Sequence, residues 1–145
     1  MKKFILSVFL TVLCGQTFAL TPEEQGLQII QEVDRRDIGF GDSKSDLKMV
    51  LRNRKGDESL RILTMKTLEV DGDGDKSLSV FSKPRDIKGT AFLSFTHALV
   101  PDEQWLYLPA LKRVKRISSS NKSGPYLGSE FAFEDLTSFE VVKYK

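Results

Sequence analysis

The sequence predicts an α+β fold in which one amphipathic helix accompanies a curved antiparallel sheet. Three observations predict it. Apolar residues recur at helical spacing near the start of the exported chain, then alternate with polar residues in six successive runs, and short turn-forming segments join these runs. Consecutive strands joined by short turns usually pair in space, so the runs predict a meander within one domain, residues 20–145.

Residues 1–19 have the composition of a cleaved secretory signal peptide. Lys2 and Lys3 precede an apolar run from Phe4 to Leu13, and Thr17-Phe18-Ala19 ends in a small residue suited to cleavage. The apolar run covers about ten residues, fewer than the ~20 that a membrane span needs. A start with two lysines is typical of bacterial export, so we expect the mature chain to be periplasmic.

The exported chain is expected to be electrically balanced and free of thiols. The whole sequence has 22 Lys and Arg against 20 Asp and Glu, and the two lysines of the signal account for the excess. This balance does not favour nucleic-acid binding, which needs a positive field. The single cysteine, Cys14, lies in the signal after Leu13, where lipidation signals prefer a small residue, so neither a disulfide nor a lipid anchor is expected.

A helix is predicted from Pro22 to Arg36. Thr21 can cap it, Pro22 suits its first position, and a glutamate stands three residues after the cap. Apolar residues then recur every three positions at Leu27, Ile30 and Val33. Such a stripe needs a partner, so we expect the helix to cover the sheet.

The period of the pattern changes to two from Asp46 onward, which predicts strands. The predicted strands are 46–52, 58–70, 76–83, 90–96, 104–108 and 111–117. Ser118 to Ser129 is rich in Ser and Gly and predicts a loop, whose length is more typical of a functional segment than of a connector. A last run, Ser138 to Lys145, predicts a further strand in which the chain stops.

Neither a metal site nor a catalytic residue is expected. The acidic run 71–75 imitates a calcium loop, but Lys76 and Ser82 stand where such a loop needs Gly and Glu, so a hairpin turn is the better interpretation. His97 is the only histidine, and no nucleophile motif accompanies it. The sequence therefore gives no support for an enzyme, and no cofactor is expected.

A basic hairpin is predicted at Lys112, Arg113, Lys115 and Arg116, within a stretch that has no acidic residue. Alternation along a strand divides these side chains between two faces, so they do not form a flat platform for nucleic acid. Two interpretations stay open: an edge hairpin protected by its charge, or a docking surface for an anionic partner such as lipid head groups, a membrane surface or an acidic protein patch.

Several segments resemble the signature segments of a known family. They are Pro84 to Leu93, Gln104 to Ile117, Gly128 to Phe131 and Phe133 to Leu136. They resemble the bacterial outer-membrane lipoprotein-sorting proteins, relatives of the periplasmic lipoprotein carriers LolA and LolB. The resemblance covers the chain from Leu20 onward and corresponds to the first part of longer members, which predicts an incomplete, truncated form of the fold.

The resemblance implies an unclosed half-barrel with the helix on its concave face and acyl chains held between them. It implies a non-enzymatic carrier of lipoprotein or lipid acyl chains, working beside a membrane transporter. From the alternation we expect these residues to line the cargo site: Leu60, Ile62, Leu93, Phe95, Trp105 and Tyr107. The same residues would equally suit a filled core. In that case the chain is a periplasmic adaptor that docks on an envelope transporter through its basic hairpin.

Overall fold

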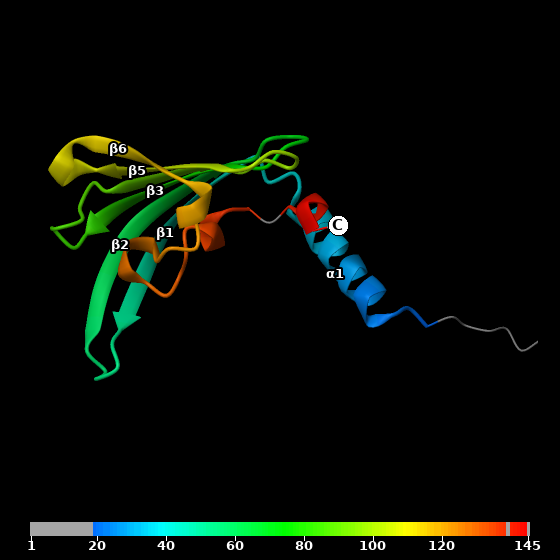
Figure 1. Cartoon of the computed structure of the whole chain (residues 1–145), viewed down its shortest axis with the longest axis horizontal. Coiled ribbons are helices and arrows are strands. Elements are labelled where there is room, and N and C mark those ends of the chain that lie inside the picture. Colours follow the sequence, from blue (N-terminus) through cyan, green and yellow to red (C-terminus); the bar gives the residue numbers. More distant parts are fainter. Residues whose placement is uncertain (1–18, 139, 145) are drawn as a thin grey trace, which may run out of the picture.

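The computed structural model describes residues 19–138 and 140–144 and contains one helix, a six-stranded antiparallel sheet and short 3-10 turns (Figure 1). The strands lie side by side in chain order. They are β1 (Asp42–Arg52), β2 (Glu58–Leu68), β3 (Lys76–Lys83), β4 (Ala91–Phe95), β5 (Glu103–Leu108) and β6 (Arg113–Ile117). The predicted α+β class, the meander and the unclosed, curved sheet are therefore confirmed. Residues 1–18 of the predicted signal peptide lie outside the described residues.

Two strand starts differ from the prediction by more than one residue, for local reasons. β1 begins at Asp42, earlier than predicted, because β2 is long enough to pair with it as far as Leu68. β6 begins at Arg113 because Pro109–Leu111 forms a 3-10 turn (η1) and Lys112 follows in the left-handed conformation, with φ 50°. The predicted pattern was correct in period and inexact at these ends.

Helix α1 (Pro22–Asp37) forms as predicted. Its first turn is closed by a capping box, in which the Glu24 amide donates to the Thr21 hydroxyl at 3.2 Å and the Thr21 amide donates to the Glu24 carboxylate at 2.8 Å. The link to β1 is held by Glu69, whose carboxylate accepts from the amides of Gly39 and Gly41 at 2.5 and 2.6 Å. These two bonds lower the pKa of Glu69.

The predicted place of the helix is wrong: α1 does not lie on the concave face of the sheet. It extends away from one end of the sheet, where its main neighbour is the 3-10 turn η5 (Val141–Tyr144) (Figure 1). None of its residues is buried, and Leu27 is 49% exposed. The physical reason is that the C-terminal segment, described next, already occupies the core side of the sheet.

The core lies on one face of the sheet, here called the core face. Leu63, Phe81, Phe92 and Leu106 are buried there and share a face through their cross-strand pairing. They pack against the segment after β6, here called the C-terminal cover (residues 118–138). Tyr126 of this cover is fully buried.

Aromatic packing joins the C-terminal cover to the sheet. The Tyr126 ring lies 5.4 Å from Phe92, 5.9 Å from Phe81 and 5.5 Å from Phe133, measured between centroids. Most of these contacts are tilted or edge-on, the favoured geometry of aromatic pairs. Burial raises the pKa of Tyr126 to about 12. The predicted Ser-rich loop is thus, in its second half, a packed cover.

Two long-range hydrogen bonds fix the C-terminal cover. Arg61 donates through its guanidinium to the carbonyl of Leu127, and the side-chain amide of the buried Gln104 donates to the carbonyl of Phe133 at 2.9 Å. Leu127 adopts a left-handed conformation, with φ 50°, which an L side chain rarely takes. Side chains from two strands therefore hold a backbone that local preference alone would not favour.

The predicted last strand, Ser138 to Lys145, is wrong. Residues 141–144 form the turn η5 at the end of the sheet. Hydrogen bonds explain this course: Ser138 donates through its hydroxyl to Asp75 at 3.1 Å and through its amide to Thr96 at 3.3 Å. These contacts hold the chain at the end of the sheet, away from an edge strand.

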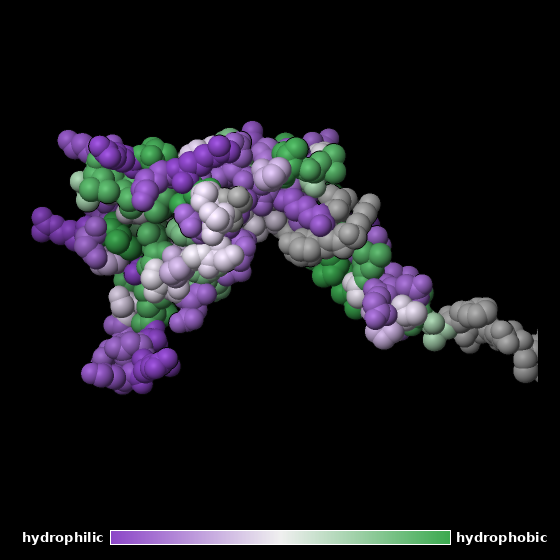
Figure 2. Space-filling model, in the orientation of Figure 1, coloured by the Kyte–Doolittle hydropathy of each residue, from purple (hydrophilic) through white to green (hydrophobic). Residues whose placement is uncertain are grey.

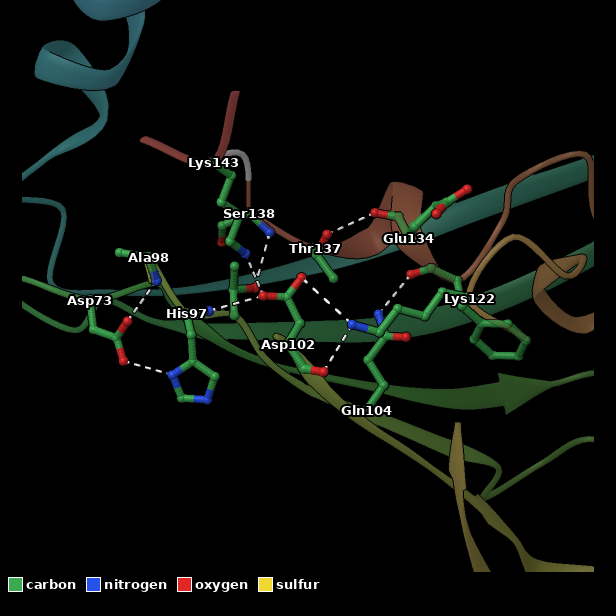
Figure 3. Close-up of polar contacts among 12 residues, drawn as sticks. Asp73, His97, Ala98, Asp102, Gln104, Lys122, Glu134, Thr137, Ser138 and Lys143 are labelled. Carbon is green, nitrogen blue, oxygen red and sulfur yellow. Dashed lines mark hydrogen bonds and ion pairs between the residues drawn. The ribbon is translucent and has the colours of Figure 1, made fainter. Parts of the chain in front are cut away.

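A polar network joins the loops at this end (Figure 3). Asp73 accepts from the Ala98 amide at 2.7 Å and contacts His97 Nδ1 at 2.7 Å. Asp102 accepts from the His97 amide at 3.0 Å and from Lys143 Nζ at 2.5 Å. The contact with His97 and the two backbone amides that point at it lower the pKa of Asp73 to about 2.

The acidic run 71–75 is the turn between β2 and β3, as predicted. Gly74 in this turn touches the next loop so closely that a Cβ atom would lie 2.6 Å from the backbone carbon of Thr96. Only glycine fits such an approach. Across residues 19–138 and 140–144, no three acidic, histidine or cysteine side chains are grouped to hold a metal ion.

The core predicts a large difference between two phenylalanines. Phe92→Ala should lower the free energy of unfolding by about 3–5 kcal/mol, because it removes a buried ring that touches both Tyr126 and Phe133. Phe131→Ala, at a ring that is 53% exposed, should change it by less than about 0.5 kcal/mol. Urea unfolding followed by circular dichroism measures both. Equal losses would mean that the C-terminal cover does not pack as described.

The Asp73 network predicts a pH-dependent contribution to stability. The pKa of Asp73 is about 2 in the folded chain and about 3.8 without these contacts, so folding favours the charged form. Its contribution is therefore full above pH ~4 and disappears as the pH falls toward ~2. Asp73→Asn should melt below the wild type near neutral pH, and the two melting curves should converge in acid. Asp71→Asn, at an exposed position of the same turn, is the control; a constant difference at all pH values would contradict the prediction.

Candidate functional site

The second face of the sheet, here called the open face, carries every residue predicted to touch cargo. Pairing places Leu93 between Leu78 and Trp105, and Tyr107 opposite Ala91. Phe95 pairs with Lys76 on the same face. Leu60 and Ile62 point to this side from β2, opposite Val50 and Lys48 of β1. The alternation in the sequence therefore grouped these six side chains correctly on one face.

The open face is not part of the filled core. Leu60 is 43% exposed and Tyr107 is 37% exposed, while Ile62, Leu93, Phe95 and Trp105 are half-buried by their neighbours in the sheet. Within the described chain, none of the six belongs to the buried core cluster. These six residues are therefore separate from the buried core that packs against the C-terminal cover.

Further apolar side chains that the sequence reasoning did not single out extend the open face. Their strand registers place these residues beside the six: Val50, Leu68, Leu78, Val80 and Val114. Figure 2 shows the side of the molecule that carries the C-terminal cover, where α1 also has apolar side chains at its surface. On the open face, the exposed apolar residues adjoin one another along and across the strands, whereas such residues are normally scattered singly on a soluble domain.

An aromatic pair lies on β4 and β5 of the open face, close to the end of β4. The rings of Phe95 and Trp105 meet edge to face at 5.2 Å, and the ammonium group of Lys76 lies 5.0 Å from the centroid of the Phe95 ring. Trp105 is the only tryptophan of the chain. Its fluorescence therefore reports on this face alone.

Lysines form the border of the open face on its β1 to β3 side. Lys44, Lys66 and Lys76 surround a shallow hollow of about 430 Å³ whose apolar lining includes Leu78 and Leu93. The sequence reasoning missed these lysines. The alternation of side chains along a strand would have indicated Lys66, because Lys66 is an even number of residues from Leu60 and Ile62 and so lies on the same face.

The basic hairpin lies at the opposite edge of the sheet, on η1 and β6. Its side chains are exposed, and they point to both faces: Arg116 is on the open face opposite Trp105, and Lys115 is on the other face opposite Leu106. Arg116 is not free, because it donates to Glu103 at 2.7 Å. The structure leaves Lys112, Arg113 and Lys115 as its exposed cations without an ion pair among the described residues.

His97 contacts Asp73 in a pair that catalytic sites also use, but the rest of such a site is not present among the described residues. No serine, threonine or cysteine side chain hydrogen-bonds to the His97 ring there. The contacts of His97 and Asp73 hold two loops together (Figure 3). In the same part of the chain, no helix combines the length and the apolar character needed to cross a membrane.

Comparison with known proteins gives two solved structures of the same fold. An outer membrane lipoprotein-sorting protein domain, so assigned, from Vibrio parahaemolyticus is 59% identical with a TM-score of 0.79, over 83% of this chain and 51% of its own. A DUF1329 family protein from Desulfovibrio piger is 31% identical with a TM-score of 0.76, over 85% of this chain and 52% of its own. The chain thus spans about half the length of each relative.

A family model described as an uncharacterized protein matches residues 73–145, which include β3 to β6 and the C-terminal cover. No curated protein matches the chain. The matched segment contains all four signature segments identified in the sequence. The chain therefore belongs to the family that this model describes, and it is similar in sequence and fold to the two solved structures.

Proposed function

We propose that this chain is a non-enzymatic binding domain for the acyl chains of a lipid or a lipoprotein, and that the open face is its contact surface. The observation that carries the proposal is the position of the six cargo candidates. They lie together on a sheet face that the described chain leaves uncovered, while a separate face holds the core.

Elementary energetics support this assignment. Moving one methylene group out of water gains about 0.8 kcal/mol, so a sixteen-carbon chain exposes roughly 12 kcal/mol of unfavourable surface to water. Exposure to water is unfavourable for the open face for the same reason, because its leucines, valines and aromatic rings contact solvent. Covering one apolar surface with the other removes both costs.

A solved relative and the signal-like residues support a cellular setting for this function. A relative assigned to outer-membrane lipoprotein sorting favours work in the bacterial envelope, and the signal-like residues 1–19 favour the periplasm. In this proposal the chain receives acylated cargo beside a membrane or a transporter. The exposed cations of the basic hairpin, at the far edge from the lysine-bordered hollow, guide that docking.

Acyl binding can be measured through Trp105. A fatty acyl chain that carries bromine atoms quenches a tryptophan it touches, so we expect saturable quenching of the wild type. Leu60→Glu should weaken binding by about tenfold or more, because it places a charge where an acyl chain contacts leucine. The side chain of Leu60 is exposed, so the variant should fold normally.

The matched control for this experiment is Leu99→Glu. Leu99 is 90% exposed and lies in the loop between β4 and β5, outside the six cargo candidates. It should bind the brominated chain like the wild type. If the folded wild type shows no saturable quenching, the binding proposal is wrong and the adaptor interpretation takes its place.

The docking role of the basic hairpin has its own test. Reversing Lys112, Arg113 and Lys115 to Glu should weaken sedimentation with anionic vesicles by more than about tenfold, because each cation near such a surface contributes about 1 kcal/mol. Raised salt should weaken the wild type in the same way. Reversing Arg54, Lys55 and Lys88, which are exposed in other turns, is the control. If the two triple variants lose vesicle binding equally, the hairpin has no special role.

A further inference from the structure

The lysines beside the open face form a cluster whose geometry is set by strand pairing. Lys44 and Lys66 are direct cross-strand partners on β1 and β2. Lys76 on β3 lies diagonally from Lys66, because Lys66 pairs with Leu78 two residues further along. Directly opposed side chains have Cβ atoms about 4.5–5.5 Å apart, and diagonal ones about 7–8 Å. Three ammonium groups can therefore reach one small anion.

Like charges in this position cost stability unless something neutralises them. Lys44 and Lys66 are opposed on adjacent strands, an arrangement that is unfavourable in a sheet. Among the described residues, no carboxylate lies within ion-pair distance of any of the three lysines. The nearby acids of this face are otherwise engaged: Asp46 accepts from Thr64 at 2.7 Å, and Glu103 accepts from Arg116 at 2.7 Å.

One acid does line the hollow, and it does not reverse the local charge. Asp42 stands at the start of β1, opposite Leu68, at the end of the hollow. The hollow therefore has three cations against one carboxylate. Its volume of about 430 Å³ is within the usual range of ligand sites.

The lysine cluster continues directly into the apolar part of the open face. The cross-strand row from Lys66 runs through Leu78 and Leu93 to Trp105. A ligand lying along this row would place a charged group at one end and an apolar chain over the aromatic pair. A free inorganic anion would use only the first half of this surface.

From this arrangement we propose that the hollow bordered by Lys44, Lys66 and Lys76 binds the phosphate head group of an acyl lipid, whose chain lies across Leu93 and Trp105. This inference rests on the proposed function, since it names the lipid class that the open face takes. Lysine ammonium groups bind phosphate through charge-assisted hydrogen bonds, which are stronger than neutral ones. The phosphate also relieves the repulsion between Lys44 and Lys66.

The test compares two lipids that differ only in the phosphate: a monoacylglycerol and the corresponding acylglycerol phosphate, both with a brominated chain. Quenching of Trp105, below the concentration at which the lipids form micelles, gives both dissociation constants. The acylglycerol phosphate should bind about tenfold or more tightly than the monoacylglycerol. Glycerol phosphate without a chain should not displace it at similar concentrations.

Variants assign the preference to the cluster. Changing Lys44, Lys66 and Lys76 to Gln should lower the affinity for the acylglycerol phosphate to that for the monoacylglycerol, and so remove the preference for phosphate. It should also raise the melting temperature or leave it unchanged, because a like-charge pair is lost. Changing the same three to Arg should retain the preference. The control triple, Arg54, Lys55 and Lys88 to Gln, removes equal charge from exposed turn positions away from the hollow and should also retain it.

The outcomes separate the two proposals. Equal affinity for both lipids, or loss of the preference in the control triple, would overturn this inference and leave acyl binding established. Glycerol phosphate that competes as well as the lipid would show a site for small phosphates and overturn the lipid assignment. If neither lipid quenches Trp105, the proposed function itself fails and the inference fails with it.

Discussion

The burial of Tyr126 against Phe81 and Phe92 is the contact on which the rest of the structure depends. This sheet carries apolar side chains on both faces, and neither face can exclude water without a covering layer. Here the chain returns after β6 and places one aromatic ring between two strands, with Phe133 beside it. Arg61 and Gln104 then fix the backbone of the cover. With this side closed, no room is left there for the helix.

The two faces of the sheet differ in that only one is covered by the described chain, and this difference connects the fold with the proposed function. The core face is completed from within the chain, by a cover of 3-10 turns that carries few but large side chains. The open face has comparable apolar character and no cover among the described residues, yet its strands are held in register by the same ladder. A rigid, preordered apolar surface loses little conformational entropy when it takes up a ligand. A rigid sheet face therefore loses less conformational entropy on binding than a flexible loop does.

The sequence predicted the features that depend on local pattern. Strict alternation in β2, β4 and β5 placed Leu60, Leu93 and Trp105 on one face, and the capping residues at Thr21 and Glu24 located the start of α1. Features that depend on distant partners could not be predicted. The last segment has the composition of a strand, but its course is decided by Ser138 and its bonds to Asp75 and Thr96. The apolar stripe on α1 likewise predicted that the helix packs against something, but it did not indicate which segment.

The lysines that border the open face are another feature that depends on distant partners and not on local pattern. Lys44 and Lys66 are separated by a hairpin in the sequence, and only the register of β1 against β2 makes them neighbours. Lys76 belongs to a third strand, and its diagonal position follows from the pairing of Leu78. Each lysine alone is an ordinary surface residue, so composition gave no sign of the cluster.

The different lengths of the strands have a consequence for how the domain opens. β1 and β2 extend beyond the rest of the sheet, because β3 pairs with β2 only from Ile62 to Leu68. Residues 50–60 therefore form a two-stranded ribbon, and no third strand of the described chain pairs with it. Its backbone amides can exchange with solvent through local fraying, without disturbing Phe92 or Tyr126. Leu60 is on this ribbon, so one margin of the open face belongs to a separate, less protected unit. In the proposed function, this margin would adjust to acyl groups of different width while the rest of the face stays in place.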